Sequence, residues 1–216
     1  MIKPYKISVP KSTLNNIYKK VRAYPWKMMQ NVDGWEYGTN YNFLKKISKY
    51  WVSKYNWKKF ENKINSFRNY KTNVDGINLH FIVEKSKNPK SRPLLLLHGW
   101  PGSVIEFFNI IPRLAHPEKF GGKIEDGFDV IVPSLPGFGF STPIKKALGP
   151  RKIGRILNKF MVKNLGHKNY IVQGGDWGAT IAAWIGLDSA KNCKAIHINC
   201  LPIRHPRGPK NNKEKN

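Results

Sequence analysis

Apolar residues recur at helical spacing through the first seventy positions of the chain. Positions three and four apart predict a helix that begins near Ser12 and ends near Pro25. The same spacing predicts a second helix over residues 40–51 and a third over residues 57–64. Stripes of this kind usually pack into a core, so we expect them to be buried. Residues 1–73 are interpreted as an aromatic, mainly helical N-terminal region.

The pattern then changes to strands that alternate with helices. Leu79, Phe81 and Val83 alternate with other residues, as in a half-buried strand, and residues 94–97 are leucine throughout, as in a buried one. Further elements are predicted as helix 103–114, strand 128–132, helix 153–162, strand 170–173, helix 179–187 and strand 193–200. This order predicts an α/β domain over residues 74–203, built on a mainly parallel, doubly wound sheet whose sites lie at the carboxyl ends of its strands.

The strongest chemical signal is the segment GGDWG at residues 174–178, between a predicted strand and a predicted helix. Gly174 and Gly178 provide the small residues that a nucleophile elbow needs two positions before and after the nucleophile. Asp176 occupies the nucleophile's place, and the following helix N-terminus favours its ionised form. A carboxylate there can attack an electrophilic carbon and form an ester that water then cleaves.

A second motif, His98-Gly99-Trp100-Pro101, follows the leucine strand. In α/β-hydrolases the oxyanion hole combines the N–H after the nucleophile with one from an earlier strand-to-helix loop. The expected donors are therefore the backbone N–H groups of Trp177 and Trp100. His98 precedes the nucleophile, whereas the base of this architecture follows it, so we interpret His98, Gly99 and Pro101 as structural residues of the loop. A third segment, LPGFGFS at 135–141, is interpreted as a tight turn without catalytic groups.

Composition adds few constraints. The chain has 216 residues, 40% of them hydrophobic, which is typical of a globular protein. Its formal net charge of +25 suggests an anionic partner, such as a membrane surface or nucleic acid. The lysines are dispersed, however, which favours solvated surfaces, and only residues 204–216 form a dense basic tail, which we expect to be disordered. Cys193 and Cys200 are expected to be reduced and buried. We see no signal peptide and no apolar run long enough to cross a membrane.

Taken together, these segments resemble the microsomal epoxide hydrolases, and among them the insect juvenile hormone epoxide hydrolases. The matching segments are LLLLHGWPGS at 94–103, VPSLPGFGFS at 132–141, VQGGDWG at 172–178 and the aromatic motif WEYG at 35–38. The resemblance extends over residues 2–201. It departs from the family pattern at residues 67–70, where FRNY stands in place of the expected FPQF.

This resemblance implies a mechanism. Asp176 would attack an epoxide carbon and form a hydroxyalkyl ester, and a histidine oriented by an acid would activate water to release a diol. Tyrosines of a cap domain would polarise the epoxide oxygen. The implied substrates are lipophilic epoxides such as juvenile hormone or xenobiotic oxides, and the implied location is the endoplasmic reticulum membrane. No metal or cofactor is implied.

The acid and the base are not evident in the sequence. The order nucleophile, acid, histidine requires two more residues after Asp176, and only His197, His205, Asp188 and Glu214 are available. None fits the expected position. We therefore expect an incomplete α/β-hydrolase domain that lacks the cap, the acid and the base, and that turns over very slowly.

Three alternatives remain open. A haloalkane dehalogenase also uses an aspartate elbow followed by tryptophan, although the N-terminal aromatic region argues against it, and halide release would distinguish it. A non-catalytic hydrolase fragment that binds a lipophilic ligand is a second possibility. A nucleic-acid binder, suggested by the charge alone, ranks last because no recognised nucleic-acid-binding motif is present.

Overall fold

The computed structural model describes residues 1–30 and 34–200, and these form two compact units. One unit contains residues 7–66, and the other contains residues 1–6 together with the chain from Phe67 onward. This division lies seven positions before the boundary expected after residue 73, because the segment after Ser66 forms a strand of the sheet. The basic tail at 204–216 lies outside the described residues.

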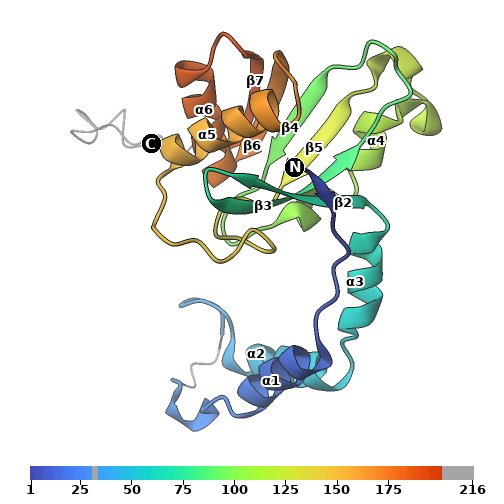
Figure 1. The fold of residues 1–216 in the computed structure, drawn as a ribbon. Coiled ribbons are helices and arrows are strands. Elements are labelled where there is room, and N and C mark those ends of the chain that lie inside the picture. The colour runs from blue at the N-terminus through green and yellow to red at the C-terminus, as the bar shows by residue number, and fades with distance from the viewer. Residues whose placement is uncertain (31–33, 201–216) are drawn as a thin grey trace. The chain divides into compact units, whose positions relative to one another are not determined.

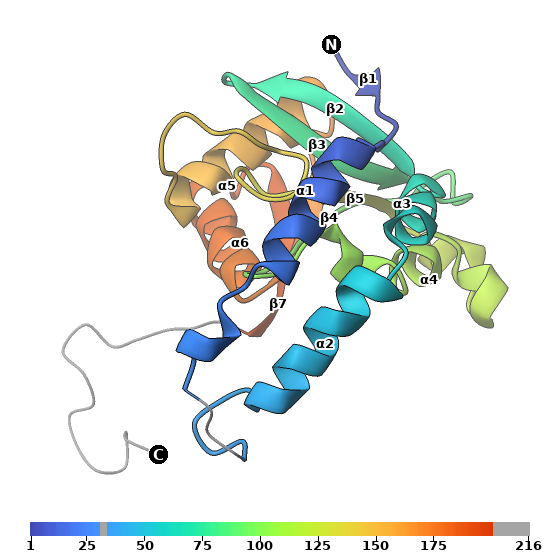
Figure 2. The same cartoon turned by 90° about the horizontal axis from the view of Figure 1, so that it is seen from below.

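The smaller unit is helical, as predicted. It contains α1 (Lys11–Arg22), a short 3-10 turn (Trp26–Met28), α2 (Tyr41–Ser53) and α3 (Trp57–Asn65). Helices α1 and α2 pack side by side (Figure 2). The side chain of Asn40 accepts a hydrogen bond from the Phe43 N–H at 3.0 Å and thereby caps the start of α2.

The apolar stripes of α1 and α2 are not buried as expected. Neither helix contains a buried residue, and Ile47 and Trp51 are 45% and 42% exposed. These stripes instead line an open groove of about 470 Å³, formed by Leu14, Ile17, Tyr18, Ile47, Tyr50, Trp51, Tyr55 and Trp57. The spacing correctly placed the residues on one face, but no described element of this unit covers that face.

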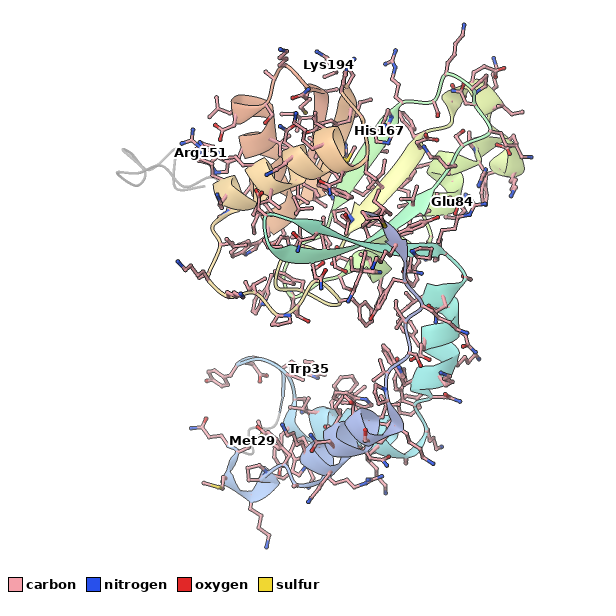
Figure 3. The ribbon with its side chains drawn as sticks, viewed as in Figure 1. Met29, Trp35, Glu84, Arg151, His167 and Lys194 are labelled. Atoms are coloured by element: carbon pink, nitrogen blue, oxygen red, sulfur yellow. The ribbon has the colours of Figure 1, made fainter. Side chains whose placement is uncertain are left out.

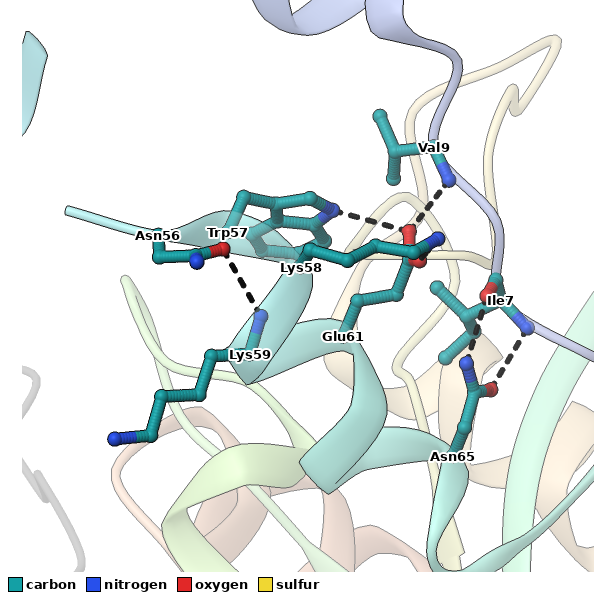
Figure 4. A network of polar contacts seen from close by, with 8 residues as sticks. All are labelled: Ile7, Val9, Asn56, Trp57, Lys58, Lys59, Glu61 and Asn65. Carbon is teal, nitrogen blue, oxygen red and sulfur yellow. Dashed lines mark hydrogen bonds and ion pairs between the residues drawn. The ribbon is translucent and has the colours of Figure 1, made fainter.

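Polar contacts hold α3 to the segment that precedes α1 (Figure 4). The buried carboxylate of Glu61 accepts hydrogen bonds from the Val9 N–H at 2.7 Å and the Trp57 indole N–H at 3.1 Å, and pairs with Lys58. Its pKa is lowered, first by Lys58. Asn65 adds a two-way bond with the Ile7 backbone.

The larger unit is built on a seven-stranded sheet with strand order β1-β2-β3-β5-β4-β6-β7 (Figure 1). The strands are β1 (Lys3–Pro4), β2 (Arg68–Val74), β3 (Ile77–Glu84), β4 (Pro93–Leu97), β5 (Asp129–Pro133), β6 (Tyr170–Gly175) and β7 (Cys193–Cys200). Pairing is antiparallel from β1 to the β3–β5 pair and parallel between β5, β4, β6 and β7. The alternating elements after residue 94 thus form a parallel sheet, as predicted.

Strand β3 differs from its predicted half-buried character. Residues Leu79 to Ile82 are all buried, because β3 lies inside the sheet between β2 and β5. Phe81 faces the main core, whereas His80 faces a set of polar partners. The alternation in the sequence is one between apolar and polar side chains, and in β3 side chains of both kinds are buried.

Helices pack on the two faces of this sheet. On one face, α5 (Pro150–Lys159), which continues into a π-helical turn (Phe160–Asn164), and α6 (Trp177–Asp188) form the main core with residues such as Leu95 and Leu97. Short elements pack near the other face: a 3-10 turn (Val104–Phe107), α4 (Ile111–Ala115), and two more 3-10 turns (Pro117–Phe120 and Ile124–Asp126). The predicted helix 103–114 is therefore two pieces, because Pro112 lacks an N–H and suits the first turn of a new helix.

Strand β7 is an edge strand of the described sheet, and most of its residues are exposed. Cys193 is buried, as expected, but Cys200 is exposed because it lies at the end of this edge. Both thiols are free, as expected. Within the described residues, no helix is both long and apolar enough to cross a bilayer.

Candidate active site

The elbow at Asp176 is a sharp turn between β6 and α6. Asp176 is the N-cap of α6 and has φ 52° and ψ −122°, a conformation that is strained for a residue other than glycine. The turn requires glycine on both sides, because a Cβ on Gly174 would overlap the carbonyl of Gly178, and a Cβ on Gly178 would overlap the carbonyl of Leu97. The sequence spacing that indicated an elbow therefore reflects direct backbone contacts.

The Asp176 carboxylate is held by backbone donors from two loops. The Trp100 N–H donates to Oδ1 of Asp176 at 2.9 Å. The pKa of Asp176 is lowered, mainly by this hydrogen bond and next by the one from the Trp177 N–H, against a smaller opposing effect of burial. The structure thus brings together both predicted donors and the predicted nucleophile, and it keeps the carboxylate ionised.

Gly99 makes this approach possible. A Cβ at Gly99 would lie 2.7 Å from both Cβ and Oδ1 of Asp176, closer than real Cβ atoms approach other atoms. Pro101 follows Trp100 through a cis peptide bond, and Trp100 is 67% exposed. The loop therefore presents its backbone, not a side chain, to the carboxylate.

His98 lies beneath the loop and is only 1% exposed. Its Nε2 accepts a hydrogen bond from the Leu135 N–H at 3.0 Å, and its Nδ1 lies 2.9 Å from the Gly99 carbonyl oxygen. Burial lowers its pKa, so the ring is neutral near pH 7. Both ring nitrogens are engaged with backbone groups, which favours the structural role predicted for His98. The same contacts connect the loop that begins at Leu135 to the site. The sequence did not indicate this connection, because the loop contains no titratable group.

The carboxylate of Asp176 opens into a pocket of about 440 Å³. The pocket is lined by Gly99, Trp100, Pro101, Gly102, Glu106, Gly175, Asp176, Asn199 and Cys200. Glu106 also caps the 3-10 turn Val104–Phe107, since its Oε1 accepts a hydrogen bond from the Ser103 N–H at 3.1 Å. The sequence analysis did not place Glu106, Asn199 or Cys200 in the site.

Asn199 and Cys200 reach the pocket because β7 pairs in parallel with β6 and ends at the elbow. The Asp176 N–H donates to the Cys200 carbonyl at 3.1 Å, which ties the elbow to the edge strand. A Cβ on Gly175 would lie 2.6 Å from Oδ1 of Asn199. The only signal in the sequence was their position at the carboxyl end of a strand beside the elbow's strand.

The candidate acids and bases after Asp176 lie elsewhere, where they are described. Asp188 forms ion pairs with Arg151 at 2.8 Å and with Arg155 at 2.9 Å (Arg151 is labelled in Figure 3). These contacts, first of all the one with Arg151, lower the pKa of Asp188 to about 2. His197 lines a different pocket, beside Leu94 and Leu96. His205 and Glu214 lie outside the described residues. No histidine of the described part lines the Asp176 pocket.

Comparison with known proteins agrees with this geometry. Residues 2–107 match the family model for the epoxide hydrolase N terminus, and residues 92–213 match that for the alpha/beta hydrolase fold. Epoxide hydrolase 1 of Oryctolagus cuniculus is 36% identical over 94% of this chain and 45% of its own length, and juvenile hormone epoxide hydrolase 1 of Ctenocephalides felis is 35% identical over 95% and 44%.

The solved juvenile hormone epoxide hydrolase of Bombyx mori matches with a TM-score of 0.78 and 33% identity, over 93% of this chain and 53% of that one. The chain thus spans about half the length of these relatives. The matches cover both the helical unit and the sheet that carries Asp176. The chain belongs to the alpha/beta hydrolase fold family and, within it, to the epoxide hydrolases.

Proposed function

We propose that Asp176 is a nucleophile that opens lipophilic epoxides and becomes esterified. The observation that carries this proposal is the 2.9 Å hydrogen bond from the Trp100 N–H to Oδ1 of Asp176, in a strained elbow that exposes the carboxylate to a pocket. The lowered pKa of Asp176 keeps it ionised at neutral pH, as a nucleophile must be.

In the first step, Oδ2 of Asp176 forms a bond to an epoxide carbon, and the bond between that carbon and the epoxide oxygen breaks. The released alkoxide takes a proton from solvent or from an acid, which leaves a hydroxyalkyl ester. Oδ1, held by the Trp100 N–H, becomes the carbonyl oxygen of this ester. The site therefore needs no rearrangement of donors between the carboxylate and its ester.

In the second step, water attacks the ester carbonyl carbon, and negative charge develops on Oδ1. The N–H groups of Trp100 and Trp177 stabilise that charge, the bond to the alkyl oxygen breaks, and a diol leaves. A general base must remove a proton from the water. No histidine of the described residues lines the pocket, so we propose that in the 216-residue chain the ester persists.

The proposed substrates are lipophilic epoxides of the juvenile hormone or xenobiotic type, and the names of two relatives support the juvenile hormone type. For the protein in the cell we propose a location at the endoplasmic reticulum membrane, where such compounds partition. The excess of lysine and arginine would also favour contact with an anionic membrane face. Fractionation of cells that express the tagged chain tests this location, and recovery outside the membrane fraction after a low-salt wash would contradict it.

The experiment for the chemistry is incubation of the purified chain with styrene oxide, followed by intact-mass analysis and quantification of styrene glycol. We expect one covalent adduct per chain and no glycol beyond the uncatalysed background. Asp176→Asn should form no adduct at a comparable rate, because the amide is not a nucleophile. An absence of adduct in the parent chain would contradict the nucleophile, and sustained glycol production would contradict the persistent ester.

A further inference from the structure

Three hydrogen bonds connect a distant loop to the Asp176 carboxylate through His98. The Leu135 N–H donates to Nε2 of His98 at 3.0 Å, Nδ1 of His98 lies 2.9 Å from the Gly99 carbonyl, and the Trp100 N–H reaches Asp176 at 2.9 Å. We propose that His98 is a positioning residue that orients the Gly99–Trp100 peptide, and thereby aims the N–H that holds the nucleophile. This inference rests on the proposed function of Asp176.

The argument depends on the geometry of one peptide group. The carbonyl of Gly99 and the N–H of Trp100 belong to the same planar unit, which is not among the cis peptides of the chain. In a trans peptide these two groups point in opposite directions. A donor that captures the Gly99 carbonyl on one side therefore directs the Trp100 N–H to the other side, toward Asp176.

The Leu135 N–H decides which ring nitrogen of His98 is the donor. A backbone N–H can only donate, so Nε2 must be the unprotonated nitrogen of the neutral ring. The proton then sits on Nδ1 and is donated to the Gly99 carbonyl. With the other tautomer, or with a doubly protonated ring, Nε2 would carry a hydrogen that faces the Leu135 N–H, and the chain of bonds would break.

The loop needs such an anchor because little else restrains this peptide. Gly99 has no side chain, and Trp100 is 67% exposed, so side-chain packing does not define the orientation of the peptide. Rotation of the peptide would turn the Gly99 carbonyl toward the Asp176 carboxylate, where two negative oxygens would repel. His98 is 1% exposed and is held on both nitrogens, so it can resist that rotation.

A second buried histidine, His80, lies on β3. Its Nδ1 lies 2.9 Å from Oγ of Ser134, and its Nε2 lies 3.0 Å from Oδ1 of Asn69. His80 is fully buried, like His98, but its hydrogen bonds go to Ser141, Ser134 and Asn69 and not to the Gly99–Trp100 peptide. It is therefore a matched control for the loss of a buried, doubly bonded histidine.

Two substitutions separate the two bonds of His98. In His98→Asn the amide nitrogen takes the place of Nδ1, so the bond to the Gly99 carbonyl can be kept. In His98→Gln the amide lies near the position of Nε2, so it can accept from the Leu135 N–H but the bond to Gly99 is lost. We expect His98→Gln to raise the pKa of Asp176, measured by 13C NMR of its carboxyl carbon, and to slow ester formation about tenfold or more. His98→Asn should keep both nearer to the parent values, and His80→Asn should change neither.

An equal effect of the two His98 variants, or an unchanged Asp176 pKa in His98→Gln, would overturn the positioning role. A measurement on the unmodified chain covers the case in which a variant does not fold. The 15N shifts of the His98 ring should show the proton on Nδ1, and a proton on Nε2 would overturn the proposal. The carboxyl titration needs no epoxide, so these results stand apart from a failure of Asp176 to react.

Discussion

The backbone N–H of Trp100 lies 2.9 Å from Oδ1 of Asp176, although the two residues are 76 positions apart in the chain. The contact joins the loop after β4 to the turn after β6, two strands that pair in parallel. The carboxylate oxygen therefore already lies in the oxyanion hole. Negative charge would develop on this same oxygen when the proposed ester is hydrolysed. The site is therefore organised before any ligand enters.

Gly99→Ala tests how closely the loop must approach the carboxylate. The new Cβ would lie 2.7 Å from Oδ1 of Asp176, so either the carboxylate or the Trp100 N–H must move. We expect ester formation to slow by about 10²-fold, as when one donor of an anion hole is lost. The matched control is Gly149→Ala, where a Cβ meets nothing within 4 Å, and there the rate should stay at the parent value. Equal rates in both variants would contradict the close approach.

Gly178→Ala tests the backbone packing of the elbow. Its Cβ would overlap the Leu97 carbonyl, and since backbone atoms cannot rotate away as a side chain can, β4 and α6 must separate. We expect a loss of unfolding free energy of about 3 kcal/mol, at the upper end for overpacking. Urea unfolding followed by circular dichroism measures it, again with Gly149→Ala as reference. A loss within the error of that reference would mean that the elbow is more adaptable than the contacts indicate.

Stability should fall as the pH is lowered from about 6.5 toward 3. Burial, and next the charge of Lys71, lowers the pKa of His80 from 6.5 to about 3, and burial lowers that of His98. Between these values the unfolded chain binds more protons than the folded one, so acid favours unfolding. For His80 alone the loss is on the order of 5 kcal/mol across that range. Carboxylates with lowered pKa, such as Glu61, add a loss of the same sign at the acidic end.

The measurement is the urea midpoint at several pH values in the parent chain and in His80→Asn. The asparagine can hydrogen-bond to Asn69 or Ser134 but does not titrate. Its midpoint should therefore depend less steeply on pH than that of the parent chain. Parallel curves for the two proteins would show that His80 is not the group responsible.

Asp188→Asn tests whether the carboxylate nearest after the elbow takes part in the chemistry. Asp188 is engaged by Arg151 and Arg155 at the end of α6 and does not line the Asp176 pocket. We expect esterification of Asp176 to proceed at the parent rate, within about twofold, because no interaction at the nucleophile is lost. A loss comparable with that of Gly99→Ala would instead assign Asp188 a part in the reaction.

The sequence was informative where chemistry and backbone geometry coincide. Glycines two positions on each side of Asp176 are required by contacts that any such turn makes, so the elbow and its donors could be predicted. The parallel sheet followed from the alternation of strands and helices. Asn199 and Cys200 could not be placed, because their position depends on the register between β7 and β6, which includes shifts near Gly174.

Periodicity was least informative about burial. It placed Ile47 and Trp51 correctly on one face of α2, but a periodic face does not reveal what covers it, and here both are more than two-fifths exposed. The prediction that follows is a contrast within the helical unit. Ile64→Ala, at a residue that is 1% exposed, should cost about 2–5 kcal/mol, and Ile47→Ala less than about 1 kcal/mol. Urea unfolding of the two variants measures the difference, and similar losses would mean that the groove is closed in solution.

The most direct measurement of the central claim is a peptide map of the chain after exposure to styrene oxide. Tandem mass spectrometry should locate the adduct on Asp176, as an ester that mild alkali removes. The same adduct should form in Cys200→Ser, which removes the exposed thiol of the pocket. An alkali-stable adduct on Cys200, or an ester on Glu106 with Asp176 unmodified, would contradict the assignment of Asp176 as the nucleophile.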